Sequence, residues 1–345
     1  MSYLHLIVKY GFFFTTCFSY ANNASAIVDI VPDSKFEHGF SMVKSPGNAP
    51  VKNYMSPLLL PGDKTPPSWA LTQFWSQEGL TGPGSVSGNC KRRWINKYKG
   101  VSLGCSNGGQ IYDLALGFNT LSEYNNTFKV FDPDQYGKYH WPDNPKWVHF
   151  GISAAPKGAP TLDKMNKLVL TMKAKLFGAQ IFTSKNCSEP KCHSLENYDQ
   201  IKSKLHIGVG FFIRNMNKNS PYYMQGVTVG VHMYDSSERM SKALKIVDPV
   251  MGVLIYRLDQ GTFTNGQSLH DGKEVAFFGD LYKGVKDSIA FACNNPIPKT
   301  ATHYFFGSCN LADYAITQVL INWELLGLGT ATIGVRDFHL YMTPN

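Results

Sequence analysis

The sequence lacks most of the features by which common protein classes are recognised. Only 17% of its 345 residues are charged. It has no Lys/Arg block and no known nucleic-acid-binding motif, which disfavours a nucleic-acid partner. It also lacks a Ser-nucleophile elbow, a phosphate loop, a dinucleotide fingerprint, a His-Glu-x-x-His motif and internal repeats. These absences lower the odds of the corresponding enzyme classes and repeat folds.

What is present favours a compact β-rich protein. Aromatic residues make up 13% of the chain, with 31 Gly and 19 Pro. Low charge and many aromatics argue against disorder. The length is ample for a buried core, and all-β proteins of this size can form one domain. We therefore expect residues 27–345 to form a single domain.

The N-terminus predicts a signal peptide over residues 1–26. Lys9 precedes an apolar run from Tyr10 to Phe18, and Ala24-Ser25-Ala26 offers a small-x-small cleavage site. The alternative is a membrane anchor, but a bilayer span needs about 20 apolar residues. No later segment is long and apolar enough to cross a membrane. We expect an exported protein, secreted or periplasmic, without a transmembrane segment after cleavage.

The net charge is mildly positive. The formal charge of +8 falls by one on cleavage, because residues 1–26 contain one Lys, no Arg and no acid. A positive field favours anionic partners such as an acidic polysaccharide. Simple solubility explains the same charge equally well.

Six cysteines remain after cleavage, and their grouping predicts three local disulfides. The expected pairs are Cys90–Cys105, Cys187–Cys192 and Cys293–Cys309. Each pair brackets a loop-like stretch, and export implies an oxidising compartment. The alternative is a metal site at Cys187, Cys192 and His193, but no second pair has zinc-site spacing.

Apolar residues alternate through several segments, as in strands with one buried face. The end of the chain, Thr317 to Met342, alternates on both sides of Gly327-Leu328-Gly329 and predicts a closing hairpin. One helix is expected, over residues 236–247, after a Ser-Ser-Glu start. The fold class is therefore all-β, a two-sheet β-sandwich of jelly-roll type with disulfide-stapled loops and at most one or two short helices. Strands are expected at 69–75, 111–118, 127–131, 168–176, 205–214, 227–234, 251–258, 263–270, 275–278 and 288–293.

The two ends of the chain resemble a known superfamily. Residues 33–40, Asp-Ser-Lys-Phe-Glu-His-Gly-Phe, and residues 336–341, Arg-Asp-Phe-His-Leu-Tyr, are similar to the first and last strands of jelly-roll carbohydrate-binding modules. The resemblance covers roughly 30 residues, and the usual Trp after the Gly is missing. It implies that these strands are neighbours and that Glu37 and Asp337 hold a structural calcium ion. The alternative is that Lys35, Arg336 or His339 neutralises these acids.

Candidate site residues lie on the non-core faces of three expected strands. If the strands are neighbours, they present one surface, and glycines there leave room for a ligand. A glycan-binding face would use Arg214, Tyr234, Asn322 and Glu324. A lyase acting on an acidic polysaccharide would use Arg214 or Asn322 for the sugar carboxylate, His206 or His232 as base and Tyr234 as proton donor. The third interpretation is an ordinary solvent-exposed sheet face.

Aromatic residues supply further candidates for sugar binding. Tyr139, Trp141 and Trp147 lie in an aromatic stretch at 132–151, and Trp94 follows the basic triplet 91–93. Aromatic rings can stack on sugars. The same residues could instead plug or cover the sandwich.

Three functions remain open at this point. The first is an exported carbohydrate-binding or surface glycan-recognition protein. The second is a polysaccharide-active enzyme, most plausibly a lyase, because no recognisable pair of hydrolytic carboxylates occurs. The third is a structural or adhesive surface protein with a protein partner.

Overall fold

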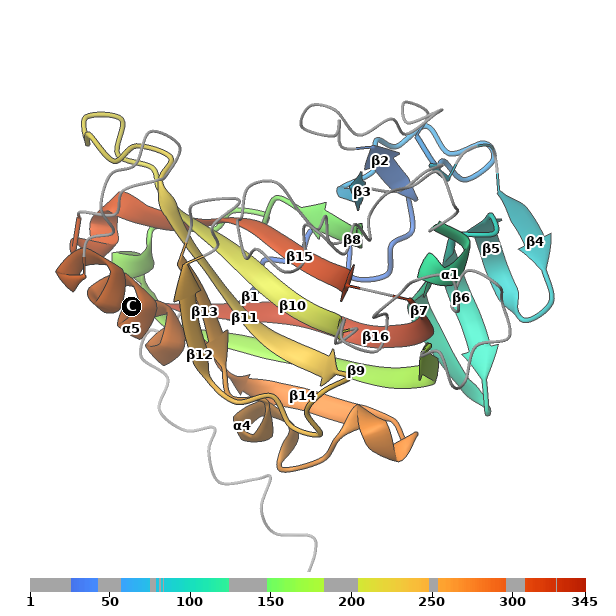
Figure 1. Ribbon diagram of the computed structural model, residues 1–345. Coiled ribbons are helices and arrows are strands. Elements are labelled where there is room, and N and C mark those ends of the chain that lie inside the picture. Colours follow the sequence, from blue (N-terminus) through green and yellow to red (C-terminus); the bar gives the residue numbers. More distant parts are fainter. Residues whose placement is uncertain are drawn as a thin grey trace, which may run out of the picture.

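The computed structural model of the chain is a β-sandwich (Figure 1). The structure describes residues 26–42, 57–74, 79–80, 82, 84–123, 148–182, 204–247, 254–295, 308–326 and 328–345. Several expected features lie outside the described residues: residues 1–25 of the expected signal peptide, the strand expected at 127–131, the aromatic residues Tyr139, Trp141 and Trp147, and the pair Cys187–Cys192. Within the described residues, no helix is long and apolar enough to span a membrane.

Two eight-stranded sheets form the sandwich, and we call them sheet A and sheet B. Sheet A has the order β14-β9-β16-β7-β6-β5-β4, with β1 also paired to β16. Its strands are β1 (Val28–Asp29), β4 (Ser85–Ser87), β5 (Cys90–Ile95), β6 (Lys99–Asn107), β7 (Gln110–Asn119), β9 (Met165–Ile181), β14 (Val275–Asp280) and β16 (Gly329–Pro344).

Sheet B has the order β12-β13-β11-β10-β15-β8-β3-β2. Its strands are β2 (Phe40–Met42), β3 (Trp69–Phe74), β8 (Val148–Ala154), β10 (Lys204–Asn215), β11 (Gly226–Asp235), β12 (Leu244–Val247), β13 (Leu254–Leu258) and β15 (Tyr314–Leu326). The helices described are α1 (Thr120–Glu123), α4 (Gln260–Thr264) and α5 (Tyr282–Asn294), with 3-10 turns η1 (Leu162–Lys164), η3 (Leu269–Asp271) and η4 (Leu311–Asp313).

One apolar core lies between the two sheets. The alternating residues of β15, such as Ile321 and Trp323, are fully buried, as are Val335 and Phe338 of β16. These side chains belong to one continuous cluster that spans both sheets. The all-β sandwich predicted from the alternation is therefore confirmed.

The expected closing hairpin is wrong. β15 pairs with β10 and β8 in sheet B, whereas β16 pairs with β7, β9 and β1 in sheet A. The two strands therefore belong to different sheets and do not pair with each other. Both strands have one apolar face, and these faces meet across the core, which produces the same alternation as a hairpin would.

The predicted position of the one expected helix is also wrong. Residues 236–247 form turns and the edge strand β12, which pairs with β13. The longest described helix is α5, which includes the segment expected as a strand at 288–293. Its buried residues Tyr282, Val285, Ile289 and Ala292 follow helical spacing. The strand expected at 263–270 is occupied by the end of α4 and by η3.

The two ends of the described chain meet in sheet A, as the resemblance implied. Val28 lies opposite Met342 and Asp29 opposite Tyr341, and Ile30 N–H donates to Leu340 O at 3.0 Å. β1 and β7 therefore lie one after the other along the same edge of β16. Between them, β16 has a bulge at which Asp337 takes a left-handed conformation with φ 54°.

Two of the three expected disulfides lie within the described residues, and both are present. Cys90 and Cys105 face each other on β5 and β6 and are bonded. Cys293, near the end of α5, is bonded to Cys309.

Candidate functional site

The outer face of sheet B carries two neighbouring rows of polar side chains. Residues opposite each other in antiparallel strands point to the same side of the sheet. The first row crosses β8, β15, β10 and β11 and consists of His149, Glu324, His206 and Asp235. The second row crosses the same strands and consists of Gly151, Asn322, Gly208 and His232. The prediction that β10, β11 and β15 present one surface is therefore confirmed.

Asp235 reaches this face because β11 contains a bulge. The register shifts between Ile207 and Gly208, so that Gly208 lies opposite His232 but Ile207 lies opposite Tyr234. Ile207 points into the core, and Tyr234 therefore does so as well. Tyr234 is 8% exposed and stacks on His270 with ring centres 4.4 Å apart. Its expected role as a proton donor or stacking ring on the outer face is wrong.

Asp235 is surrounded by nitrogen atoms from three strands. Its Oδ2 lies 3.2 Å from His206 Nε2 and 3.8 Å from His232 Nδ1. Arg257, on β13, places Nη1 3.7 Å from the same oxygen. Arg257 Nη1 also donates to His232 Nδ1 at 3.2 Å. The Asp235 side chain is only 3% exposed, whereas those of His206 and His232 are 19% and 24% exposed.

The environment fixes the charges of this group. Burial opposes ionisation of Asp235, but its contacts with His206, His232 and Ser237 hold its pKa well below its usual range. Burial lowers the pKa of His232, and Asp235 offsets only part of this effect. Asp235 is therefore an anion at neutral pH, and His232 is a neutral imidazole that can accept the Arg257 hydrogen bond.

Glu324 forms a second part of the same face. Its Oε1 lies 3.7 Å from His149 Nδ1 and accepts from Asn322 Nδ2 at 3.4 Å. His149 Nε2 in turn lies 3.2 Å from Thr72 Oγ1. Burial raises the pKa of Glu324, but the contact with His149 outweighs this effect, and the pKa lies below its ordinary value. The carboxylate is therefore ionised at neutral pH, and the 44% exposure of its side chain also favours the charged form.

Glycines interrupt the row of side chains on this face. Gly208 and Gly210 on β10 and Gly230 on β11 all lie on the outer side. A methyl group at Gly230 would come 2.8 Å from Val209 O, whereas at Gly208 it would meet only ordinary contacts of 3.5 Å or more. The strip next to Asn322 and His232 can therefore receive a group from outside.

Arg214 points to the same face of β10 but lies far from this group. It lies eight residues beyond His206 on β10, which corresponds to about 27 Å along a strand. There it pairs with Gly226 and Ala315 and covers the ring of Phe212. The set of His206, Arg214, His232, Tyr234 and Asn322 proposed for a lyase is therefore not assembled, because Arg214 is too far away and Tyr234 points inward.

Trp94 is not a binding residue either. It is 2% exposed on β5 of sheet A. Its Nε1 donates to Gly82 O at 3.1 Å, and its ring meets Phe40 edge-on. A buried ring cannot stack on a ligand, so the interpretation of Trp94 as a covering residue is the one that holds.

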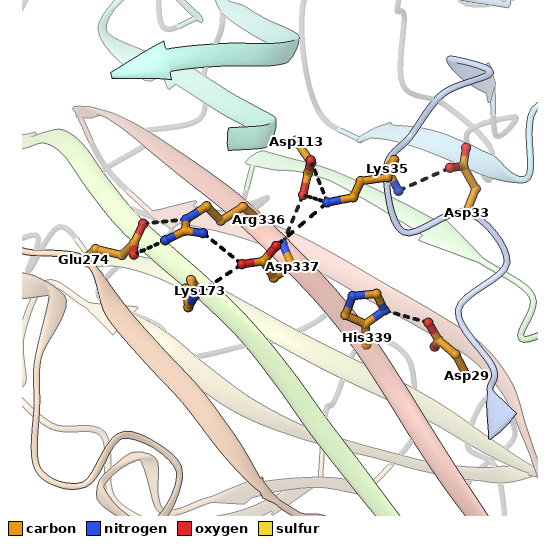
Figure 2. A network of polar contacts seen from close by, with 9 residues as sticks. All are labelled: Asp29, Asp33, Lys35, Asp113, Lys173, Glu274, Arg336, Asp337 and His339. Atoms are coloured by element: carbon orange, nitrogen blue, oxygen red, sulfur yellow. Dashed lines mark hydrogen bonds and ion pairs between the residues drawn. The ribbon is translucent and has the colours of Figure 1, made fainter. Parts of the chain in front are cut away.

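A second polar cluster lies on the outer face of sheet A (Figure 2). Asp337 is close to three cations: Arg336 at 2.9 Å, Lys173 at 3.3 Å and Lys35 at 3.8 Å. Lys35 also contacts Asp113 at 3.1 Å. His339 pairs with Asp29 at 2.7 Å, and Glu37 is exposed in a nearby turn. Cations of the chain thus surround Asp337, which matches the alternative to a calcium ion at Glu37 and Asp337, and the calcium itself stays a prediction.

The sequence missed three members of the sheet B site. Asp235 directly follows the expected strand end, and only the bulge brings it onto the face. Arg257 lies on the expected strand at 251–258, but the parallel pairing of β13 with β11 could not be inferred. His149 lies in the aromatic stretch at 132–151, for which no strand was expected.

Comparisons with known proteins do not identify the chain. No family model and no curated protein matches its sequence. Among solved structures it is similar to the endoglucanase Cel12A from Rhodothermus marinus, with 8% identity and a TM-score of 0.35 over 72% of this chain and 87% of that one. The family 11 xylanase from Neocallimastix patriciarum gives 9% identity and a TM-score of 0.34 over 73% of this chain and 90% of that one. The family 12 xyloglucanase from Bacillus licheniformis gives 10% identity and a TM-score of 0.36 over 80% of this chain and 93% of that one. Similarities at this level carry no argument about the chemistry of the chain.

Proposed function

We propose that the protein binds a carbohydrate on the outer face of β15, β10 and β11. The observation that carries this proposal is the pair of polar rows at Glu324 and His206 and at Asn322 and His232, beside the uncovered backbone of Gly208. Carboxylate, amide and imidazole groups can exchange hydrogen bonds with sugar hydroxyls. The glycine allows a sugar ring to approach the sheet.

The charges of the face favour a neutral glycan over an acidic one. Asp235 and Glu324 are both ionised, and Arg257 is the cation that contacts this group. Asp235, Glu324 and Arg257 together carry one negative charge. An acidic sugar would be repelled unless a further cation took part. The positive net charge of the whole chain therefore does not determine whether a neutral or an acidic glycan binds at this site.

Binding fits the site better than hydrolysis. A glycosidase needs one carboxyl group that is protonated at the working pH and a second one that is ionised. Here the surroundings lower the pKa of both Asp235 and Glu324. Neither carboxyl group is held ready to donate a proton.

A glycan array followed by affinity gel electrophoresis tests the proposal. We expect retention by a neutral polysaccharide, and we expect Asn322→Ala and Glu324→Gln each to weaken it about tenfold, which is equivalent to ~1.4 kcal/mol. Thr171→Ala, on β9 of the other sheet, is the control and should bind like the wild type.

Two results would contradict the proposal. If no glycan retains the protein, the proposal is wrong. If both variants are retained as strongly as the wild type, the glycan binds to another surface. The same polysaccharides should be incubated with the protein while the ultraviolet absorbance of unsaturated uronates is recorded. A rise in that absorbance would instead favour the lyase.

A further inference from the structure

Three possible metal-ligating atoms converge on the outer face of sheet B. His206, His232 and Asp235 each offer one ligand atom, and these three atoms lie within 4.8 Å of one another. They come from β10 and from both sides of the bulge in β11. We propose that these three residues form a binding site for a divalent transition-metal ion such as Zn²⁺. This inference does not depend on the binding of a glycan.

The ligand set suits such an ion. Two imidazoles and one carboxylate are the protein ligands of many zinc sites that keep one position open. Imidazole also binds Ni²⁺ and other first-row metals. With bonds of ~2.1 Å in tetrahedral geometry, neighbouring ligand atoms lie about 3.4 Å apart. The separations from Asp235 Oδ2, 3.2 Å to His206 and 3.8 Å to His232, bracket that value.

Asp235 is held in the orientation that a ligand needs. Its Oδ1 accepts hydrogen bonds from Ser237 N at 2.8 Å and from Ser237 Oγ at 2.6 Å. The carboxylate cannot rotate without losing both bonds, and Oδ2 is therefore directed at the two imidazoles. Outer partners of this kind orient ligands in metal sites. The side chain is 3% exposed, so that it is fixed by packing as well.

Arg257 competes with a metal ion for one of the three ligands. Its Nη1 donates to His232 Nδ1 at 3.2 Å, and the same nitrogen lone pair would be needed to bind a metal. The guanidinium and the metal ion are therefore mutually exclusive on His232. Arg257 has other partners to retain, since its Nε donates to Lys242 O at 2.7 Å and its Nη2 lies 3.8 Å from Glu238. A modest turn of the guanidinium away from His232 would open the site.

This competition gives a test with effects in two directions. The full chain, untagged and with its disulfides intact, is freed of metal by a chelator and titrated with ZnCl₂ in a calorimeter. We expect one Zn²⁺ per chain. Removing a ligand in His206→Gln or His232→Gln should weaken binding at least about tenfold. Removing the competitor in Arg257→Gln should instead strengthen it.

The control and the contradicting results are specific to this site. His339→Gln removes an imidazole that pairs with Asp29 on sheet A and should bind Zn²⁺ like the wild type. Circular dichroism checks that each variant is folded. If neither the wild type nor Arg257→Gln binds Zn²⁺, the proposal is wrong. It is also wrong if His206→Gln and His232→Gln both bind as tightly as the wild type. Repeating the glycan assay with chelator separates this outcome from a failure of carbohydrate binding.

Discussion

Arg336 and Glu274 share two parallel hydrogen bonds on the outer face of sheet A, from Nε to Oε2 at 2.9 Å and from Nη2 to Oε1 at 2.7 Å (Figure 2). Their side chains are only 18% and 24% exposed. Arg336 is on β16 and Glu274 directly precedes β14, with β9 between these strands. The pair therefore fastens the edge strand β14 across its neighbour.

Removal of the arginine should destabilise the protein measurably. We expect Arg336→Met to lower the free energy of unfolding by about 1.5–3 kcal/mol, the usual range for lost charge-assisted hydrogen bonds. Denaturant titration gives this quantity. Lys283→Met is the control, because Lys283 pairs with Asp287 on the exposed side of α5 and its loss should change nothing measurable. Equal stability of Arg336→Met and the wild type would show that the pair is only a surface contact.

The same pair should make stability depend on acid. The Arg336 hydrogen bonds lower the pKa of Glu274 from its ordinary value of 4.5. A carboxyl group with a lowered folded pKa contributes stability that is present above the unfolded pKa and lost as the pH falls through the folded pKa. We expect the unfolding free energy of the wild type to fall below pH ~4.5. Glu274→Gln should show a shallower fall over that range, measured by denaturant titration at each pH. Parallel curves would mean that other carboxyl groups account for the acid sensitivity.

The disulfide between Cys90 and Cys105 should stabilise the β5–β6 pair. Its sequence separation is 15, and closing a loop of that size is worth about 3 kcal/mol in the chain-entropy model. The double variant Cys90→Ser, Cys105→Ser should unfold more easily by that order. Peptide mapping without reduction tests all three predicted pairs, including Cys187–Cys192. Free thiols at Cys187 and Cys192 would favour the alternative of a metal site in that loop.

The strands were predictable from the sequence because burial on one face leaves a period of two. The bulge in β16 can also be seen in the spacing of the apolar residues. The buried residues run Ile333, Val335 and then Phe338, Leu340, a step of three that marks the extra residue at Asp337. The partner of each strand was not predictable, because alternation is the same whether two strands pair within a sheet or face each other across the core. The mistaken hairpin of β15 and β16 follows from this ambiguity.

The sequence predicted which face carries the candidate site, but not all of its residues. His206, His232, Asn322 and Glu324 were correctly grouped because their strands have strict alternation. Tyr234 was misplaced because the bulge in β11 reverses the alternation after His232, and nothing in the residue types announces it. The same reversal brought Asp235 onto the face. The extra residue in β11 thus turns Tyr234 into the core and places Asp235 on the outer face.

Calcium binding at the chain ends remains open to a direct measurement. The resemblance predicts calcium at Glu37 and Asp337, and the ion would raise the melting temperature if bound only by the folded state. Lys35 already lies between Asp113 and Asp337, where it supplies a positive charge. We therefore expect equal melting temperatures with calcium and with chelator in the wild type. A rise with calcium that is lost in Asp337→Ala would show that the ion displaces these lysine contacts.

The sharpest test of the sheet B face is to place one methyl group on it. A Cβ at Gly208 would lie 3.6 Å from both Asn322 Oδ1 and His232 Cδ2, and 3.5 Å from Val231 O. These are ordinary contacts, so Gly208→Ala should fold and melt like the wild type. The methyl group would nevertheless cover the strip through which a sugar is proposed to reach the sheet. We expect affinity for the glycan to fall at least about tenfold, or ~1.4 kcal/mol, as measured by affinity electrophoresis.

Gly178→Ala is the matched control for this substitution. Gly178 lies on β9 of sheet A, where a Cβ would meet nothing within 4 Å. It makes the same chemical change in a strand of the opposite sheet, and its glycan affinity should equal that of the wild type. If Gly208→Ala also binds like the wild type while both variants are folded, the ligand does not approach the backbone between Asn322 and His232. The proposed approach of the sugar to the sheet backbone at Gly208 would then be wrong.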